Sequence, residues 1–220
     1  LPELEQFMIH KIYSLNNKFK NYFKNYDFHN LYKELLNFCT VDLSALYFDI
    51  RKDTLYCDEF DSQKRQSTII LLNIILNALL KWFAPILSFT TEEIFRLISK
   101  NNKSIHLEKF LNFPSSFKNE ALNNKWQELI KIRNICNISI EEKRASKEIG
   151  SSLEAELKID LNDKFKDITK NIDFSELCIT SKATISFSTI TEVEVNTIKA
   201  KGSKCPVCWK ISEELCPRHS

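Results

Sequence analysis

The last 17 residues of the chain, KCPVCWKISEELCPRHS, contain a cluster of potential metal ligands that limits how this region can fold. Cys205 and Cys208 are separated by two residues, and Cys216 and His219 repeat that spacing. A two-residue gap lets both side chains of a pair face one point, so two pairs can hold a tetrahedral Zn²⁺ ion. Three thiolates and one imidazole favour zinc over hard cations. The spacing predicts one structural zinc ion, because four protein ligands leave no open position for water.

The composition restricts the kinds of function open to the chain. Its 220 residues are enough for one or two domains. Its two glycines, Gly150 and Gly202, lie far apart, which excludes a glycine-rich phosphate loop. The formal net charge of +2 means that any contact with nucleic acid must come from a local patch.

The remaining cysteines indicate the cellular compartment. Cys39, Cys57, Cys136 and Cys178 are scattered, the total of seven is odd, and no secretory signal is visible. This pattern predicts a reducing cytoplasm. The chain begins at a leucine rather than a methionine, and we expect it to be a piece of a longer polypeptide.

The longest apolar run, TIILLNIILNALLKWFAPIL, is interrupted by Asn73, Asn77 and Lys81. Their four-residue spacing places them in one polar stripe along a helix. We therefore predict a helix of a soluble core that ends before Pro85, and no membrane span.

Apolar periodicity predicts helices over residues 2–26, from 28 into the fifties, 64–83 and 118–149, with a possible break between 40 and 42. Asp27 is the predicted N-cap of the second helix. A further helix is predicted to begin with a capping box of Thr90 and Glu93, flanked by a hydrophobic staple of Phe89 and Ile94. Gly150 is the predicted cap at the end of the last helix. Alternating apolar and polar residues then predict strands over 153–161 and 182–195. The expected fold is mainly α, with a helical bundle over 1–152, a small α/β unit over 153–200 and a zinc knuckle over 201–220.

Three stretches together resemble one enzyme family. NFCTVDLSALYFDIRKDTLYCD, LLKWFAPILSFTTEEIF and the terminal cysteine cluster are similar, in this order, to the C-terminal third of bacterial isoleucyl-tRNA synthetases. IGSSLEAEL also looks like the link that leaves the helical domain in that family. The resemblance spans essentially the whole chain.

The resemblance implies an anticodon-binding helical domain of the class I synthetase type and a zinc domain that helps to hold the anticodon of tRNA(Ile). ATP binding, isoleucine activation and editing would belong to N-terminal domains of the same polypeptide that this chain does not include. No HIGH-like signature is present, and KRASKEIG only superficially echoes the KMSKS loop. We expect the chain to be a monomer without catalytic residues that is inactive alone.

Two positions depart from the family pattern. The family usually has a fourth cysteine where His219 stands. An imidazole can replace a thiolate as a zinc ligand, so zinc is still expected. The family often has an arginine between the first two cysteines, where Val207 stands here, so one expected contact with the anticodon is absent.

Several residues are candidates for RNA contact. Trp209 follows Cys208 and would offer a flat surface on which unstacked bases can stack, although it could instead pack on the α/β unit. Lys204 and Lys210 lie in a small positive patch that would meet phosphates. Arg51 and Lys52 end a helix and would either contact the anticodon stem or cap that helix. Arg133 lies on an apolar helix face, as a buried ion-pair partner or as an RNA-groove residue.

Two other functions are compatible with the same residues. The first is a helical scaffold whose zinc knuckle docks other proteins, which predicts an exposed apolar patch and no RNA affinity. The second is a metalloenzyme in which one displaced ligand leaves an open metal position.

Overall fold

The computed structural model describes residues 1–99, 103–189, 192–216 and 218–219. These residues form two compact units. Unit 1 comprises Leu1–Arg51 with Glu59–Asn123, and unit 2 comprises Lys52–Asp58 with Asn124–Ser220. The expected mainly helical fold with a small α/β part is confirmed.

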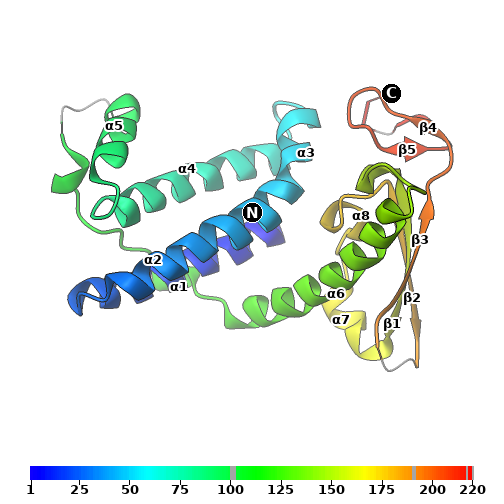
Figure 1. The fold of residues 1–220 in the computed structure, drawn as a ribbon, viewed down its shortest axis with the longest axis horizontal. Helices are drawn as coiled ribbons and strands as arrows, with labels where there is room; N and C mark the ends of the chain where they lie inside the picture. The colour runs from blue at the N-terminus through cyan, green and yellow to red at the C-terminus, as the bar shows by residue number, and fades with distance from the viewer. Residues whose placement is uncertain (100–102, 190–191, 217, 220) are drawn as a thin grey trace. The chain divides into compact units, whose positions relative to one another are not determined.

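Unit 1 is built from helices (Figure 1). Helix α1 packs against both α2 and α4, and α4 packs against α5. Short 3₁₀ turns occupy Ile105–Leu107 and Ser115–Phe117. The long elements are α1 (Glu3–Lys24), α2 (Phe28–Asn37), a π-helix (Phe38–Phe48), the start of α3 (Asp49–Cys57), α4 (Gln63–Phe83) and α5 (Ser88–Ile98).

Trp82 on α4 marks the centre of the helical core. Its side chain is fully buried, its ring lies edge-on to Phe19 at 4.9 Å, and its indole N–H donates to Asn16 Oδ1 over 3.1 Å. Among the described residues, α4 alone is long and apolar enough to span a bilayer by length and composition. Its Leu71 and Ile75 are nevertheless buried in unit 1, as expected for a helix in a protein core.

The break predicted between residues 40 and 42 is absent: α2, the π-helix and α3 follow one another without interruption. The Thr40 hydroxyl donates to the Leu36 carbonyl over 2.9 Å, so the side chain supports the helical path. The buried positions here are Phe38, Asp42, Leu43, Leu46 and Tyr47, and steps of four residues recur among them. On an α-helix of 3.6 residues per turn each such step drifts by about 40°. The wider π turns rotate less per residue, so these buried positions do not drift in the α-helical sense.

A buried ion pair joins this long helix to α1. The guanidinium of Arg51 contacts both carboxylate oxygens of Glu5, with nitrogen–oxygen distances of 2.6 and 2.8 Å. The hydroxyls of Tyr47 and Thr68 also donate to Glu5 Oε1, over 3.2 and 3.5 Å. Glu5 is fully buried and Arg51 is 4% exposed, so this is a structural contact inside unit 1.

The Asp27 cap is confirmed, because its carboxylate accepts the Asn30 amide hydrogen at the start of α2. The Thr90–Glu93 capping box is wrong. Helix α5 already begins at Ser88, so Thr90 lies inside its first turn, and the 92% exposed Phe89 forms no hydrophobic staple.

The predicted Gly150 cap is also wrong. Helix α6 (Glu120–Ala145) ends earlier than expected, and Lys147, with φ of 61°, takes the left-handed conformation. The Gly150 amide instead donates to Glu154 Oε2 over 3.0 Å. Lys147 therefore takes the left-handed position that usually belongs to glycine or asparagine after a helix, so the sequence did not indicate this helix end.

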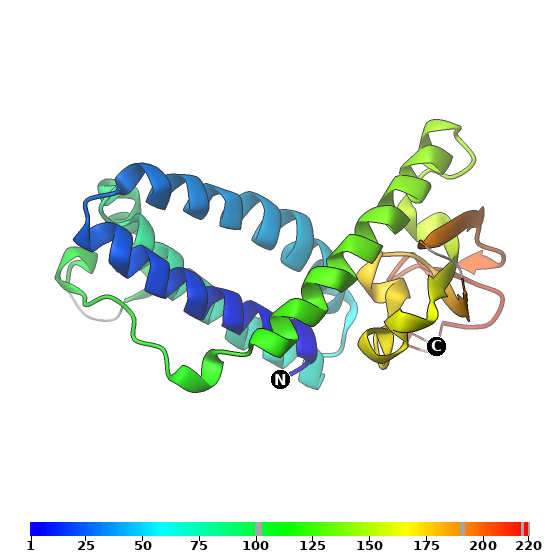
Figure 2. The same ribbon diagram turned by 90° about the horizontal axis from the view of Figure 1, so that it is seen from below.

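Unit 2 places most of α6 beside a small mixed sheet (Figure 2). Strand β1 (Ala155–Asn162) is central, parallel to β2 (Lys182–Ser188) and antiparallel to β3 (Glu194–Lys199). The connection from β1 to β2 carries α7 (Lys166–Thr169) and α8 (Phe174–Leu177). Alternate residues of β1 are buried, and Ser139 of α6 bonds Thr197 of β3, hydroxyl to hydroxyl, over 2.7 Å.

Candidate functional site

A short hairpin shapes the first half of the knuckle. Strands β4 (Ser203–Lys204) and β5 (Ile211–Ser212) pair antiparallel. Between them, the Cys205 amide donates to the Lys210 carbonyl over 2.9 Å. Gly202 precedes β4 with φ of +117°, and a Cβ there would lie 2.0 Å from the Ser212 carbonyl oxygen. Only glycine fits this close approach of the two strands.

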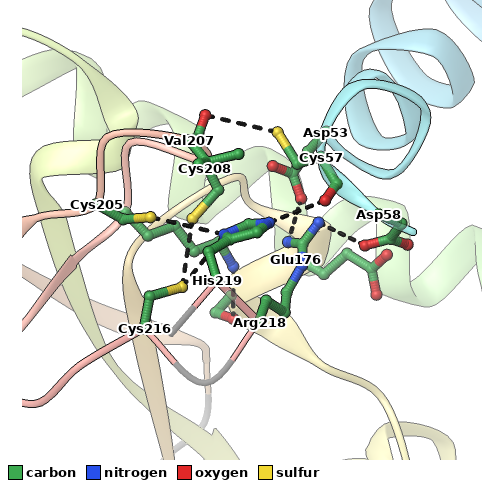
Figure 3. Close-up of polar contacts among 12 residues, drawn as sticks. Asp53, Cys57, Asp58, Glu176, Cys205, Val207, Cys208, Cys216, Arg218 and His219 are labelled. Carbon is green, nitrogen blue, oxygen red and sulfur yellow. Dashed lines mark hydrogen bonds and ion pairs between the residues drawn. The ribbon is translucent and has the colours of Figure 1, made fainter.

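The four predicted ligands converge at this hairpin. The sulfurs of Cys205, Cys208 and Cys216 and a ring nitrogen of His219 all lie within 4.8 Å of one another (Figure 3). The Cys208 and Cys216 sulfurs are 3.8 Å apart. His219 Nδ1 lies 3.6 Å from the Cys205 sulfur and 3.4 Å from that of Cys216.

Three of these ligand–ligand distances can be compared with those around a tetrahedral zinc ion. With zinc–sulfur bonds of about 2.3 Å and zinc–nitrogen bonds of about 2.0 Å, ligand atoms lie about 3.5–3.8 Å apart. The closest described approaches, between 3.4 and 3.8 Å, agree with that value. The donor set therefore suits zinc in its chemistry, and these three distances suit a tetrahedral site.

Hydrogen bonds to sulfur prepare part of the cluster for a metal. Backbone amides of Cys208 and Val207 lower the pKa of Cys205 to about 6. Burial would raise the pKa of Cys216, but a backbone amide and the imidazole of His219 bring it below its usual value. Burial raises the pKa of Cys208 to about 11. Two thiols are thus biased toward the thiolate that binds metal, and the third would lose its proton on metal binding.

The knuckle is held to the last turn of α3, which belongs to the same unit. The Arg218 guanidinium contacts Asp53 over 2.7 Å and Asp58 over 2.5 Å (Figure 3). The Nε2 atom of His219 lies 2.9 Å from the Cys57 carbonyl oxygen. None of these contacts had a local sequence signal, because the partners lie about 160 positions apart.

Trp209 lies on the surface of the knuckle. Its side chain is 58% exposed, and the Lys204 ammonium lies 5.0 Å from the ring centre. Its φ of 65° is in the left-handed region, where a bulky side chain costs about 1–2 kcal/mol. The Trp209 amide donates to the Cys205 carbonyl over 3.0 Å, so the turn fixes this conformation. A tryptophan in a conformation that suits glycine, with an exposed ring, points to a function for the ring.

A groove of about 770 Å³ lies within unit 2, lined by the knuckle and by residues of the sheet, and the four predicted ligands are part of its lining. Its lining includes three acidic residues, of which Glu156 pairs with Lys182 over 3.4 Å. Lysines outnumber them and make the groove a positive surface next to Trp209. The lining lysines are Lys158, Lys182, Lys201, Lys204 and Lys210.

The other RNA candidates lie in different environments. Lys52 is exposed. Arg51 is buried against Glu5, and Arg133 is 6% exposed and donates from Nε to the Leu177 carbonyl over 2.8 Å. Because neither guanidinium is presented to solvent, both arginines are left out of the RNA surface proposed below.

Comparison with known proteins gives one family and a set of relatives. The family described as "Anticodon-binding domain of tRNA ligase" matches residues 5–159. An isoleucine–tRNA ligase of Pelagibacter ubique is 68% identical over 220 residues, which cover 100% of this chain and 24% of that protein. Those of Agrobacterium fabrum and Bartonella quintana are 36% and 35% identical, over 98% of the chain and 23% of each relative. The chain thus spans about a quarter of the length of these curated relatives.

Proposed function

Because the chain belongs to the family of anticodon-binding domains of tRNA ligases, we propose that it is the part of an isoleucine–tRNA ligase that recognises the anticodon region of tRNA(Ile). The ligation of isoleucine with ATP, and editing, would take place in other domains of the same cytoplasmic polypeptide. The chain itself would act as a monomer that supplies affinity and selection. The division into helical (1–152), α/β (153–200) and knuckle (201–220) parts remains part of this proposal.

One structural Zn²⁺ ion completes the proposal. Cys205, Cys208, Cys216 and His219 would hold it, and their spacing supports a closed tetrahedral site. When bound, the ion would supply folding free energy to a segment with little apolar core. Because all four positions are filled by protein, the site would have no role in hydrolysis, which speaks against a metalloenzyme.

The observation that carries the RNA proposal is the exposed ring of Trp209 on the knuckle surface, next to Lys204 and the lysine-lined groove. Bases of a single-stranded loop can be splayed out, and stacking on an aromatic ring contributes about 1–3 kcal/mol per base. Lys204, Lys210 and Lys52 would meet phosphates nearby. The Val207 side chain is half exposed and offers no hydrogen bond to a base, so selection among anticodons would come from other groups of the knuckle.

A filter-binding titration with tRNA(Ile) transcripts tests this function. We expect Trp209→Ala to weaken binding by about 1–3 kcal/mol. Lys204→Ala and Lys210→Ala should each reduce the salt dependence of log K by about one unit, the value of one phosphate contact. The matched control is Lys170→Ala, an exposed lysine of unit 2 outside the groove, which should change neither quantity.

Transcripts with altered anticodons complete the titration. The proposal predicts weaker binding to them, because their bases would no longer fit the knuckle. Equal binding to all transcripts would leave only attraction to phosphates and refute anticodon recognition. No measurable binding to any transcript would instead favour a scaffold that docks proteins.

A further inference from the structure

His219 uses its two ring nitrogens in opposite directions. Nδ1 faces the sulfurs of Cys205 and Cys216, while Nε2 lies 2.9 Å from the Cys57 carbonyl oxygen. A carbonyl oxygen only accepts hydrogen bonds, so Nε2 carries the hydrogen. In the neutral imidazole Nδ1 then has the free electron pair, and this pair points at the position of the proposed ion. The hydrogen bond thus selects the tautomer that binds metal.

Other contacts join the knuckle to the same turn of α3. Arg218 lies next to His219 and bonds Asp53 and Asp58. In the other half of the knuckle, the Val207 carbonyl oxygen accepts a hydrogen bond from the Cys57 thiol, with the sulfur 3.7 Å from the oxygen. Both ligand pairs of the knuckle therefore have a neighbouring residue that contacts this turn, so the turn is a docking surface for the whole ligand site (Figure 3).

We infer that metal binding and docking of the knuckle on residues 53–58 are one coupled event, with His219 as the link and Arg218 as a positioning residue. An ion on Nδ1 fixes the ring so that Nε2–H reaches Cys57, and the hydrogen bond in turn fixes Nδ1 for the ion. A thiolate at position 219 would supply a ligand but no outward donor. It would complete the metal site without linking it to the helix.

This inference rests on the proposed zinc site and extends it. Besides stabilising the fold of the knuckle, the ion would fix the position of the Trp209 ring relative to the last turn of α3, because the ion site and Trp209 both belong to the knuckle. The Arg218 guanidinium is paired with Asp53 and Asp58, and the Cys57 carbonyl with His219, so we assign both groups to positioning the knuckle.

The test compares the wild-type chain with His219→Cys, with zinc and after chelation. Metal content and the cobalt(II) absorption spectrum report the coordination, which should change from three sulfurs and one nitrogen to four sulfurs. Docking is read from amide hydrogen exchange across residues 53–58 and from the rate at which an alkylating reagent modifies Cys57. Cys39, which is half-buried in unit 1, serves as the reference thiol.

In the wild type, zinc should slow the alkylation of Cys57 and the amide exchange of the turn, and loss of the docking contact should cost about 10–100-fold in zinc affinity, the usual effect of an outer partner of a metal-bound histidine. His219→Cys should still bind one ion, but zinc should then protect the turn several-fold less. Arg218→Met, which keeps all four ligands, should weaken zinc binding and docking together. The reference thiol should react at the same rate in every sample.

Equal zinc protection of residues 53–58 in the wild type and in His219→Cys would overturn the inference, as would a turn that stays protected after chelation. A wild-type chain that binds no zinc would refute the metal site itself. Failure of the chain to bind tRNA would refute the RNA function and leave the measured coupling in place.

Discussion

The Glu5–Arg51 pair allows a direct test of whether Arg51 stabilises the fold or contacts RNA. Replacing Arg51 by methionine leaves the Glu5 carboxylate fully buried with only the hydroxyls of Tyr47 and Thr68. Removal of one partner of a buried pair destabilises a protein by about 3–5 kcal/mol, because the other charge stays in a medium of low dielectric. We expect a loss of this size for Arg51→Met, and a similar loss for Glu5→Leu.

The double variant Glu5→Leu with Arg51→Met should recover most of this loss. Two apolar side chains of similar volume then replace two charges, which is often neutral or stabilising. The coupling free energy from the double-mutant cycle should exceed about 2 kcal/mol, because each single change leaves the other charge unpaired.

The assay is urea unfolding, with the fluorescence of Trp82 as the reporter for unit 1. Phenylalanine replaces Trp126 and Trp209 in all samples, so that the signal comes from one ring. If Arg51→Met leaves the unfolding midpoint unchanged and instead weakens tRNA binding, the guanidinium acts on RNA and the reasoning is wrong. An additive double-mutant cycle would also refute it.

Three further predictions concern other parts of the chain. His10 is buried, and its Nδ1 accepts the Asn119 amide hydrogen over 2.9 Å. Burial lowers the pKa of His10 below the usual 6.5. The neutral imidazole therefore contributes stability above pH 6.5, and this contribution is lost as the pH falls through the lowered pKa. His10→Asn should keep the acceptor and flatten the decline of the urea midpoint between pH 7.5 and pH 5.5 (on the order of 1 kcal/mol per pKa unit). Gly202→Ala should open the hairpin and speed the loss of zinc to a chelator, while circular dichroism of the helices stays unchanged, because its Cβ would lie 2.0 Å from the Ser212 carbonyl oxygen. Cys208→Ser should lose stoichiometric zinc by elemental analysis, since three ligands do not close the site.

The sequence predicts structure where one short segment contains all the residues that determine it. The apolar periodicity of α1 and α4 predicted both helices to within two residues, because each buries a long stripe on one side. The convergence of Cys205 with Cys208 also follows from local spacing alone. In such cases the neighbours along the chain determine the geometry.

The sequence does not predict structure where a side chain bonds a residue far away in the chain. Glu92, next to the residue predicted for the capping box, bonds the Ser104 hydroxyl and the Ile105 amide 12 and 13 positions away. The sequence places Arg51 at the end of a helix, but α3 continues to Cys57 and the partner of Arg51, Glu5, lies 46 positions earlier. No local pattern contains these pairings, because they arise only when the helices pack.

The π-helix has a consequence for how the protein tolerates changes in length. In a regular α-helix each residue adds about 100° of rotation, so deletion of one residue swings the remainder of the helix onto another side. Wide turns between Phe38 and Phe48 hold spare backbone. Deletion of the exposed Ser44 could tighten one of them into an α turn and leave Arg51 opposite Glu5. Deletion of one residue before Leu71 in α4 would rotate Leu71 away from its neighbours, so single deletions should be better accepted between Phe38 and Phe48 than in α4.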